Sequence, residues 1–321
     1  PVNYLRLSVT YRCDFRCQYC MAENMKFLPK KELLSLQELE RICATFIKLG
    51  TKKIRITGGE PLVRKNVMQL FSNLGKFIET KELKELTLTT NGSQLSRYAK
   101  ELYSYGVRRV NVSIDTLDPS LFLSLTRRGN LKQVLEGIDA AKQAGLAVKI
   151  NTVALKDSNE HELLDILKWA HNNDCDMTII ETMPLGEISE DRTDQFLPLS
   201  KVKEKIQEKY TLEKTNYVTG GPSRYFYVKE TQKKIGFITP MTHNFCESCN
   251  RVRLTCTGKL YMCLGKDDSA DFREPVRSIN WKTDLEKSIK EAISRKPKGH
   301  DFIIRRKQNP SVKRHMSVTG G

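Results

Sequence analysis

Short apolar runs rich in β-branched residues alternate with amphipathic stretches through the first two-thirds of this chain. The runs predict strands at residues 4–10, 53–57, 86–90, 109–114, 147–153 and 177–181. Between them, apolar residues that recur every three or four positions predict helices at 36–49, 66–78, 95–105, 131–144 and 160–172. Such alternation is typical of a parallel sheet with crossover helices. About six units are present, fewer than the eight of a complete barrel, so we expect an α/β fold with an incomplete (β/α)6 TIM-type barrel.

The pattern changes after Met183. Residues 184–198 are polar and rich in turn formers. Beyond them we expect helices at 199–209 and 282–294, short strands near 225–229 and 234–239, and a hairpin around Thr257-Gly258-Lys259. We therefore divide the chain into a barrel domain, residues 1–183, and a C-terminal extension, residues 184–321.

Composition narrows the class of partner and the compartment. The chain has 54 Lys and Arg against 38 Asp and Glu, a net charge of +16, which favours an anionic partner. The basic residues are dispersed and none of the common nucleic-acid motifs occurs, so we expect a phosphorylated small molecule and no nucleic acid. No apolar run approaches membrane-spanning length and no signal-peptide pattern occurs. Nine cysteines that occur in groups favour metal binding in a reducing cytoplasm, without a membrane.

The first cysteine group follows the first predicted strand directly. Cys13, Cys17 and Cys20 have the spacing C-x3-C-x2-C. Three thiolates can hold three corners of a cubane iron–sulfur cluster and leave one iron open for a small molecule. A closed zinc site needs a fourth ligand, and the next Cys or His along the chain is Cys43. The group lies at the carboxyl end of a strand, where parallel βα folds carry their active sites.

A second group of three cysteines lies in the extension. Its members are Cys246, Cys249 and Cys263. The spacing leaves open a zinc site, with His243 or Cys256 as fourth ligand, and a second cluster. Arg251 and Arg253 follow Cys249, and two arginines two positions apart in a strand share a face. Arginine suits phosphates and purine edges.

Gly58-Gly59-Glu60-Pro61 follows the second predicted strand. Together with C-x3-C-x2-C it resembles the radical S-adenosylmethionine (SAM) superfamily. With the second cysteine group, its two arginines and the terminal Gly320-Gly321, the chain resembles the GTP 3′,8-cyclase family of molybdenum-cofactor biosynthesis over its whole length. Further matching stretches are Leu5–Thr10, Lys53–Thr57, Thr89–Gly92, Asn111–Asp115 and Val148–Asn151.

The resemblance implies a role for particular residues. Cys13, Cys17 and Cys20 would bind a 4Fe-4S cluster whose open iron is chelated by SAM. A second 4Fe-4S cluster would be bound by Cys246, Cys249 and Cys263. The SAM pocket would be lined by Tyr19, Gly59, Ser113 and Met183. GTP would be surrounded by Arg6, Arg55, Thr89, Lys149, Arg251 and Arg253, among which Arg6, Arg251 and Arg253 would be catalytic.

The resemblance also implies a reaction and partners. A 5′-deoxyadenosyl radical would take the C3′ hydrogen of GTP, and C3′ would bond to C8 to give (8S)-3′,8-cyclo-7,8-dihydroguanosine 5′-triphosphate. The implied partners are an electron donor of flavodoxin or ferredoxin type, a downstream cyclic pyranopterin monophosphate synthase and a second copy of the chain. In one departure, Thr178 stands where many relatives have an arginine, so we expect either that Arg192 or Lys156 binds the phosphate instead or that the affinity for GTP is lower.

Two other classes of protein remain as alternatives. One is a radical SAM maturase with an auxiliary cluster that acts on a peptide. The other is a basic zinc protein that binds RNA. The arginines after Cys249 and the terminal Gly-Gly favour the cyclase. We expect Cys43 and Cys175 to be packing residues and Cys256 to bind no metal.

Overall fold

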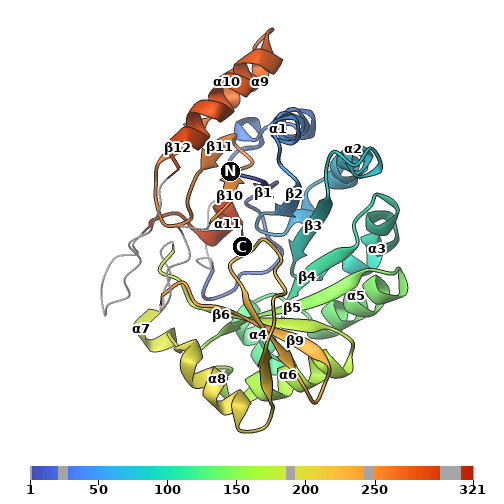
Figure 1. Cartoon of the computed structure of the whole chain (residues 1–321), viewed down its shortest axis with the longest axis vertical. Coiled ribbons are helices and arrows are strands. Elements are labelled where there is room, and N and C mark those ends of the chain that lie inside the picture. The colour runs from blue at the N-terminus through green and yellow to red at the C-terminus, as the bar shows by residue number, and fades with distance from the viewer. Residues whose placement is uncertain (1, 21–27, 186–191, 242–248, 297–311, 321) are drawn as a thin grey trace.

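The computed structural model describes residues 2–20, 28–185, 192–241, 249–296 and 312–320. Figure 1 shows an open arc of strands with helices along its outer side. The six predicted central strands are present and pair in parallel in chain order. They are β1 (Tyr4–Ser8), β2 (Lys53–Thr57), β3 (Glu85–Thr90), β4 (Arg109–Ser113), β5 (Ala147–Ala154) and β6 (Asp176–Glu181). The prediction of an incomplete (β/α)6 barrel is confirmed.

The crossover helices also agree with the predicted pattern. They are α1 (Leu36–Lys48), α2 (Val67–Glu79), α3 (Leu95–Ser104), α5 (Leu131–Gln143) and α6 (Leu163–Asn172). Short 3-10 helices occur at η1 (Lys30–Glu32), η2 (Pro61–Val63) and η3 (Glu160–Glu162). Ser35 and Glu38 form a reciprocal capping box that fixes the start of α1.

One helix of the barrel was not expected. Helix α4 (Pro119–Thr126) is capped at its N-terminus by Asp118, whose side chain accepts a hydrogen bond from the backbone N–H of Leu121. Its apolar residues occupy more than one face, so the sequence shows no clear helical period. Phe122 packs edge-to-face on Phe15, with ring centroids 5.9 Å apart, and α4 thereby covers the loop that carries the first cysteines.

The C-terminal extension lengthens the barrel sheet at both edges. Strand β9 (Lys233–Ile238) pairs in parallel with β6, and β10 (Arg251–Leu254) pairs in parallel with β1. Antiparallel strands then follow on each side: β8 (Arg224–Val228) and β7 (Leu212–Lys214) beyond β9, and β11 (Lys259–Tyr261) and β12 (Ser269–Asp271) beyond β10. One sheet therefore continues across residue 183, and the expected hairpin is β10–β11.

The remaining described helices lie in the extension. They are α7 (Arg192–Gln195), α8 (Leu199–Gln207), α9 (Arg273–Arg277), α10 (Trp281–Ser294) and α11 (Met316–Thr319). In Figure 1, α9 and α10 form an arm at one end of the arc, and α11 brings the end of the chain to the middle of the arc, beside β1. No helix in the described ranges is both long enough and apolar enough to span a membrane.

Side chains alternate along each barrel strand between two faces. The outward residues, such as Leu5, Ile54 and Val110, belong to the buried apolar core under the helices. The residues between them are polar and line a cavity, as Arg6 and Arg55 do. A complete barrel fills its interior with branched apolar side chains. This arc instead encloses a polar interior, and that difference creates the candidate site.

Candidate functional site

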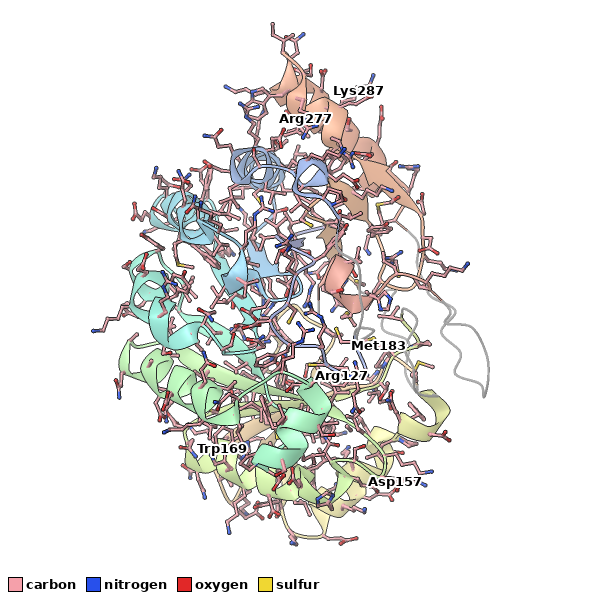
Figure 2. The ribbon with its side chains drawn as sticks, turned by 180° about the vertical axis from the view of Figure 1, so that it is seen from behind. Arg127, Asp157, Trp169, Met183, Arg277 and Lys287 are labelled. Atoms are coloured by element: carbon pink, nitrogen blue, oxygen red, sulfur yellow. The ribbon has the colours of Figure 1, made fainter. Side chains whose placement is uncertain are left out.

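The cavity brings together all the described residues that the sequence analysis assigned to a cluster, to SAM or to GTP. These residues are Arg6, Cys13, Cys17, Tyr19, Cys20, Arg55, Gly59, Thr89, Ser113, Lys149, Met183, Cys249, Arg251, Arg253 and Cys263. Cys246 lies outside the described residues. Figure 2 shows Met183 toward the open side of the arc, well away from Trp169 on α6 and from Arg277 and Lys287 on the arm. Residues of the barrel domain and of the C-terminal extension thus line the same cavity.

The Gly-Gly turn after β2 packs directly on the first cysteine loop. The backbone N–H of Gly59 donates to the carbonyl of Thr10 at 2.8 Å, and that of Glu60 donates to the carbonyl of Arg12 at 2.8 Å. A Cβ atom at Gly59 would lie 2.3 Å from the Arg12 carbonyl oxygen. A glycine is therefore required here because two backbones approach closely, with no room for a side chain.

The first cysteines fit an iron–sulfur cluster. Burial raises the pKa of the Cys13 and Cys17 thiols, so iron must displace their protons when it binds. No three His, Cys, Asp or Glu side chains of the described ranges could hold a single metal ion. A cubane offers a separate iron to each thiolate, so its ligands need not converge on one point. The three cysteines line the same cavity, as a cluster open to a ligand requires.

The second cysteine group borders the same cavity through Cys249 and Cys263. Burial alone would raise the pKa of Cys249, but the positive charges of Arg251 and Lys296 outweigh it and lower the pKa. Lys296 Nζ lies 3.8 Å from Cys249 Sγ. Cys256 is fully buried and does not line the cavity. His243 lies outside the described residues.

Asp115 is a site residue that the sequence analysis missed. Tyr19 Oη donates to Asp115 Oδ2 at 2.6 Å and so ties the cysteine loop to the end of β4. Burial raises the pKa of Asp115 to about 6, although the hydrogen bonds from Tyr19 and the backbone N–H of Val153 oppose the shift. Asp115 lies two residues beyond Ser113, the last residue of β4, and its spacing in the sequence does not indicate the contact with Tyr19.

Three arginines stand side by side across three neighbouring strands. Arg6 on β1 is in register with Arg55 on β2 and with Arg253 on β10. None of them forms an ion pair with a carboxylate in the described ranges. Burial, followed by the charges of Arg6 and Arg251, holds the pKa of Arg253 well below its usual range. Like charges gathered in this way, with Arg6 and Arg55 buried and Arg253 half-buried, favour an anionic ligand.

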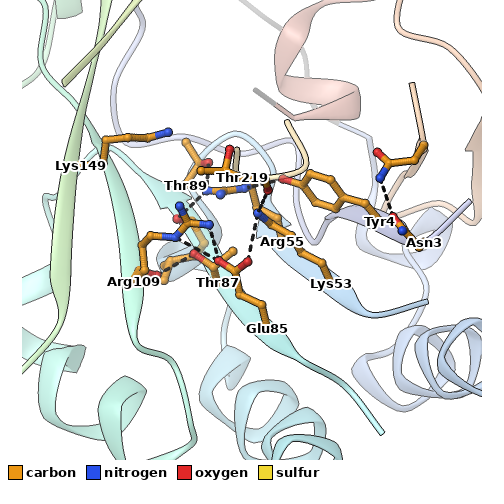
Figure 3. Close-up of polar contacts among 12 residues, drawn as sticks. Asn3, Tyr4, Lys53, Arg55, Glu85, Thr87, Thr89, Arg109, Lys149 and Thr219 are labelled. Carbon is orange, nitrogen blue, oxygen red and sulfur yellow. Dashed lines mark hydrogen bonds and ion pairs between the residues drawn. The ribbon is translucent and has the colours of Figure 1, made fainter. Parts of the chain in front are cut away.

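Arg55 also belongs to a second layer of cations, which includes Lys53 at the amino end of β2 (Figure 3). Arg55 Nε donates to Tyr4 Oη at 2.7 Å and its Nη1 to Thr89 Oγ1 at 3.2 Å. Lys53 Nζ donates to the Thr219 carbonyl at 2.7 Å and pairs with Glu85 at 3.1 Å. The sequence analysis missed Tyr4, Lys53 and Thr219 in this layer. Lys53 could have been found, because it shares the face of Arg55.

Lys149 points into this layer from β5. Its Nζ donates to Tyr225 Oη at 2.7 Å. Burial alone would raise the pKa of Tyr225, but Lys149 outweighs it and lowers the pKa to about 8. Thr178 Oγ1 is buried without a hydrogen-bond partner in the described part of the chain. Lys156 does not line the cavity, and the side chain of Arg192 lies outside the described residues, so neither expected replacement is supported.

Sequence comparison identifies close relatives. The profile of the Radical SAM superfamily matches residues 7–170, and that of Molybdenum Cofactor Synthesis C matches residues 175–302. The chain is 62% identical over 321 residues to a GTP 3′,8-cyclase of Brucella ovis, across 100% of this chain and 93% of that protein. It is 63% identical to the Rhizobium etli protein of the same name and 61% identical to that of Mesorhizobium japonicum, which it covers to 92% and 97%.

Solved structures agree on the fold. SuiB of Streptococcus suis, in complex with its precursor peptide SuiA, matches with a TM-score of 0.61 at 16% identity, over 88% of this chain and 66% of that one. SuiB bound to S-adenosylmethionine matches with a TM-score of 0.60 at 14% identity, over 98% and 77%. At these identities the likeness shows a shared fold only.

Proposed function

We propose that this chain, which belongs to the GTP 3′,8-cyclase family of the radical SAM superfamily, converts GTP to (8S)-3′,8-cyclo-7,8-dihydroguanosine 5′-triphosphate in the first step of molybdenum-cofactor biosynthesis. One observation carries the proposal: a single cavity is lined by described cysteines of both groups and by several cationic side chains. The cysteines are Cys13, Cys17, Cys20, Cys249 and Cys263, and the cations include Arg6, Arg55, Lys149, Arg251 and Arg253. The identity of 62% over the whole chain to a GTP 3′,8-cyclase supports the same reaction.

Two 4Fe-4S clusters and SAM are the implied cofactors. Cys13, Cys17 and Cys20 would hold the first cluster, and Cys246, Cys249 and Cys263 the second. When bound, the first cluster and SAM supply a 5′-deoxyadenosyl radical that takes the C3′ hydrogen of GTP. Tyr19, Gly59, Ser113 and Met183 would border SAM, with Tyr19 fixed by its hydrogen bond to Asp115.

The chain's own residues would bind and orient GTP. A triphosphate carries about four negative charges, which the cations Arg55, Lys53 and Lys149 can match with charged hydrogen bonds. The adjacent Arg6, Arg251 and Arg253 would fix the nucleoside so that C3′ lies close to C8, an orientation task that binding energy serves well. The product is an isomer of GTP, because the hydrogen lost from C3′ is balanced by one electron and one proton delivered to the guanine ring.

A peptide maturase is not favoured as an alternative. SuiB shares the fold at 16% identity, whereas the cyclases share 62% over the full chain. The zinc-dependent RNA-binding alternative is likewise not supported by these relatives. On the resemblance to this family we further propose a cytoplasmic location, an electron donor of flavodoxin or ferredoxin type, a homodimeric state and a downstream cyclic pyranopterin monophosphate synthase.

Anaerobic reconstitution with iron and sulfide tests the proposal. The protein should bind about eight irons, as two cubanes require, and form 5′-deoxyadenosine from SAM only when GTP is present. The control is a Cys13→Ser, Cys17→Ser, Cys20→Ser variant, which should keep the second cluster and form no 5′-deoxyadenosine. GTP-independent formation of 5′-deoxyadenosine in the parent protein would contradict GTP as the substrate.

A further inference from the structure

A polar network supports the first cysteine loop from the side of β3. Both carboxylate oxygens of Asp14 are held by the turn that follows β3. Asn91 Nδ2 donates to Asp14 Oδ1 at 2.7 Å, and Ser93 Oγ donates to Asp14 Oδ2 at 2.5 Å. Asp14, the residue next to Cys13, is therefore held in place by the turn at Asn91–Ser93, which is far away in the sequence.

The turn itself is fixed by the glutamate of the Gly-Gly-Glu-Pro motif. Glu60 is 0% exposed. Its carboxylate accepts hydrogen bonds from the backbone N–H of Asn91 at 2.6 Å, from Thr90 Oγ1 at 2.8 Å and from the backbone N–H of Leu62 at 3.1 Å. Three donors satisfy this buried group, so Glu60 sets the position of the Asn91 backbone.

Asn91 also contacts a cluster ligand. Its Nδ2 lies 3.8 Å from Cys13 Sγ, within reach of an N–H···S hydrogen bond, and the residue lines the cavity. An amide has two N–H donors, so one can bind Asp14 while the other faces the sulfur. The backbone N–H of Phe15 approaches the same sulfur at 3.4 Å.

We infer that Asn91 is a positioning residue of the first cluster, which donates an N–H···S hydrogen bond to Cys13 and raises the reduction potential of that cluster. The inference rests on the proposed function, because it requires a cluster on Cys13, Cys17 and Cys20. Hydrogen bonds to the sulfurs are among the factors that set cluster potentials. A donor stabilises the reduced cluster more than the oxidised one, because the reduced cluster carries one more negative charge.

Two matched variants test the inference in a Cys249→Ser, Cys263→Ser background, where only the first cluster contributes to the spectrum. Asn91→Leu has a similar volume and no N–H donor. Ser93→Ala removes the other hydrogen bond to Asp14 and leaves the sulfur untouched. In a reductive titration followed by electron paramagnetic resonance, Asn91→Leu should shift the potential to a more negative value at unchanged iron content, and Ser93→Ala should not shift it.

An equal potential in Asn91→Leu and the background protein would overturn the inference, as would an equal shift in Ser93→Ala. If Asn91→Leu binds no cluster, the hydrogen bond is tested in the background protein itself, labelled with ¹⁵N only in its asparagine side chains. A ¹⁵N coupling at the reduced cluster supports the hydrogen bond, and its absence overturns it. A background protein that binds no cluster at all would instead contradict the proposed function.

Discussion

Arg6 and Arg253 lie directly opposite each other on the adjacent parallel strands β1 and β10, although they are far apart in the sequence. Arg253 also donates from Nη1 to the carbonyl of Gly320, near the C-terminus. The first strand, the strand between Cys249 and Cys263, and the C-terminal tail therefore meet at one point. Two like charges therefore lie side by side, Arg6 buried and Arg253 half-buried.

Replacement of Arg253 by Met should weaken GTP binding and stabilise the GTP-free protein. A hydrogen bond to a charged group contributes about 1.5–3 kcal/mol, so we expect binding to be about 10- to 100-fold weaker. The midpoint of thermal unfolding should rise by about 2 °C, because a half-buried like charge next to Arg6 is removed. Calorimetry measures both quantities. Arg97→Met on the outer face of α3 is the control and should change neither, and a destabilised Arg253→Met protein would contradict the account.

GTP affinity should depend on pH through Lys53. Burial lowers the pKa of Lys53 to about 8, with Arg55 adding to the shift and Tyr4 opposing it. Bound triphosphate favours the protonated amine, so GTP binding takes up a proton and affinity falls as pH rises through about 8. Binding isotherms in buffers of different ionisation enthalpy measure the uptake. The arginine of Lys53→Arg keeps its proton, so the GTP affinity of this variant should change less with pH. The same pH dependence of GTP affinity in both proteins would exclude Lys53 as the group that takes up the proton.

Gly59→Ala should disrupt the first cysteine loop. The added Cβ would lie 2.3 Å from the Arg12 carbonyl oxygen, so one of the two backbones must move. We expect roughly half of the bound iron to be lost, as the first of two clusters fails to assemble. Gly221→Ala is the matched control, since its nearest neighbour would be 3.4 Å away. Full iron content in Gly59→Ala, measured colorimetrically, would show that the close approach does not matter for cluster binding.

Gly320→Ala should impair catalysis through the tail. Gly320 has φ +75°, and a Cβ there would lie 2.1 Å from Thr57 Cγ2, so the tail must leave its place beside Arg253. Small displacements of groups that orient a substrate cost up to about 100-fold in rate, and we expect kcat to fall at least about tenfold. Val318→Ala, on the same short helix, serves as the control. Hydrogen exchange over residues 316–320 would show whether the tail has detached, and a tightly docked tail in Gly320→Ala would contradict this prediction.

Much of the barrel could be predicted from sequence because each strand and helix shows its own period. The strand at 53–57 and the helix that begins at residue 36 were found nearly residue for residue. Helix α4 was missed because its apolar residues follow no single face. The pairing of β10 with β1 could not be predicted, since no local pattern encodes which distant strands become neighbours.

The candidate site was predicted where residues lie within motifs and missed where contacts are long-range. Lys53 is recognisable in retrospect from its two-residue spacing to Arg55. Tyr225 and Asp115 belong to the site only because folding brings them to Lys149 and Tyr19. Asn91 was quoted only as part of a matching stretch, and its contact with Cys13 depends on a buried glutamate that sequence alone does not place.

The central claim is that this cavity performs radical cyclisation of GTP. The most direct test supplies the reconstituted, reduced protein with SAM and with GTP deuterated at C3′, and then analyses the 5′-deoxyadenosine by mass spectrometry. The account predicts deuterium in the 5′-deoxyadenosine. Unlabelled 5′-deoxyadenosine that forms equally without GTP would contradict it.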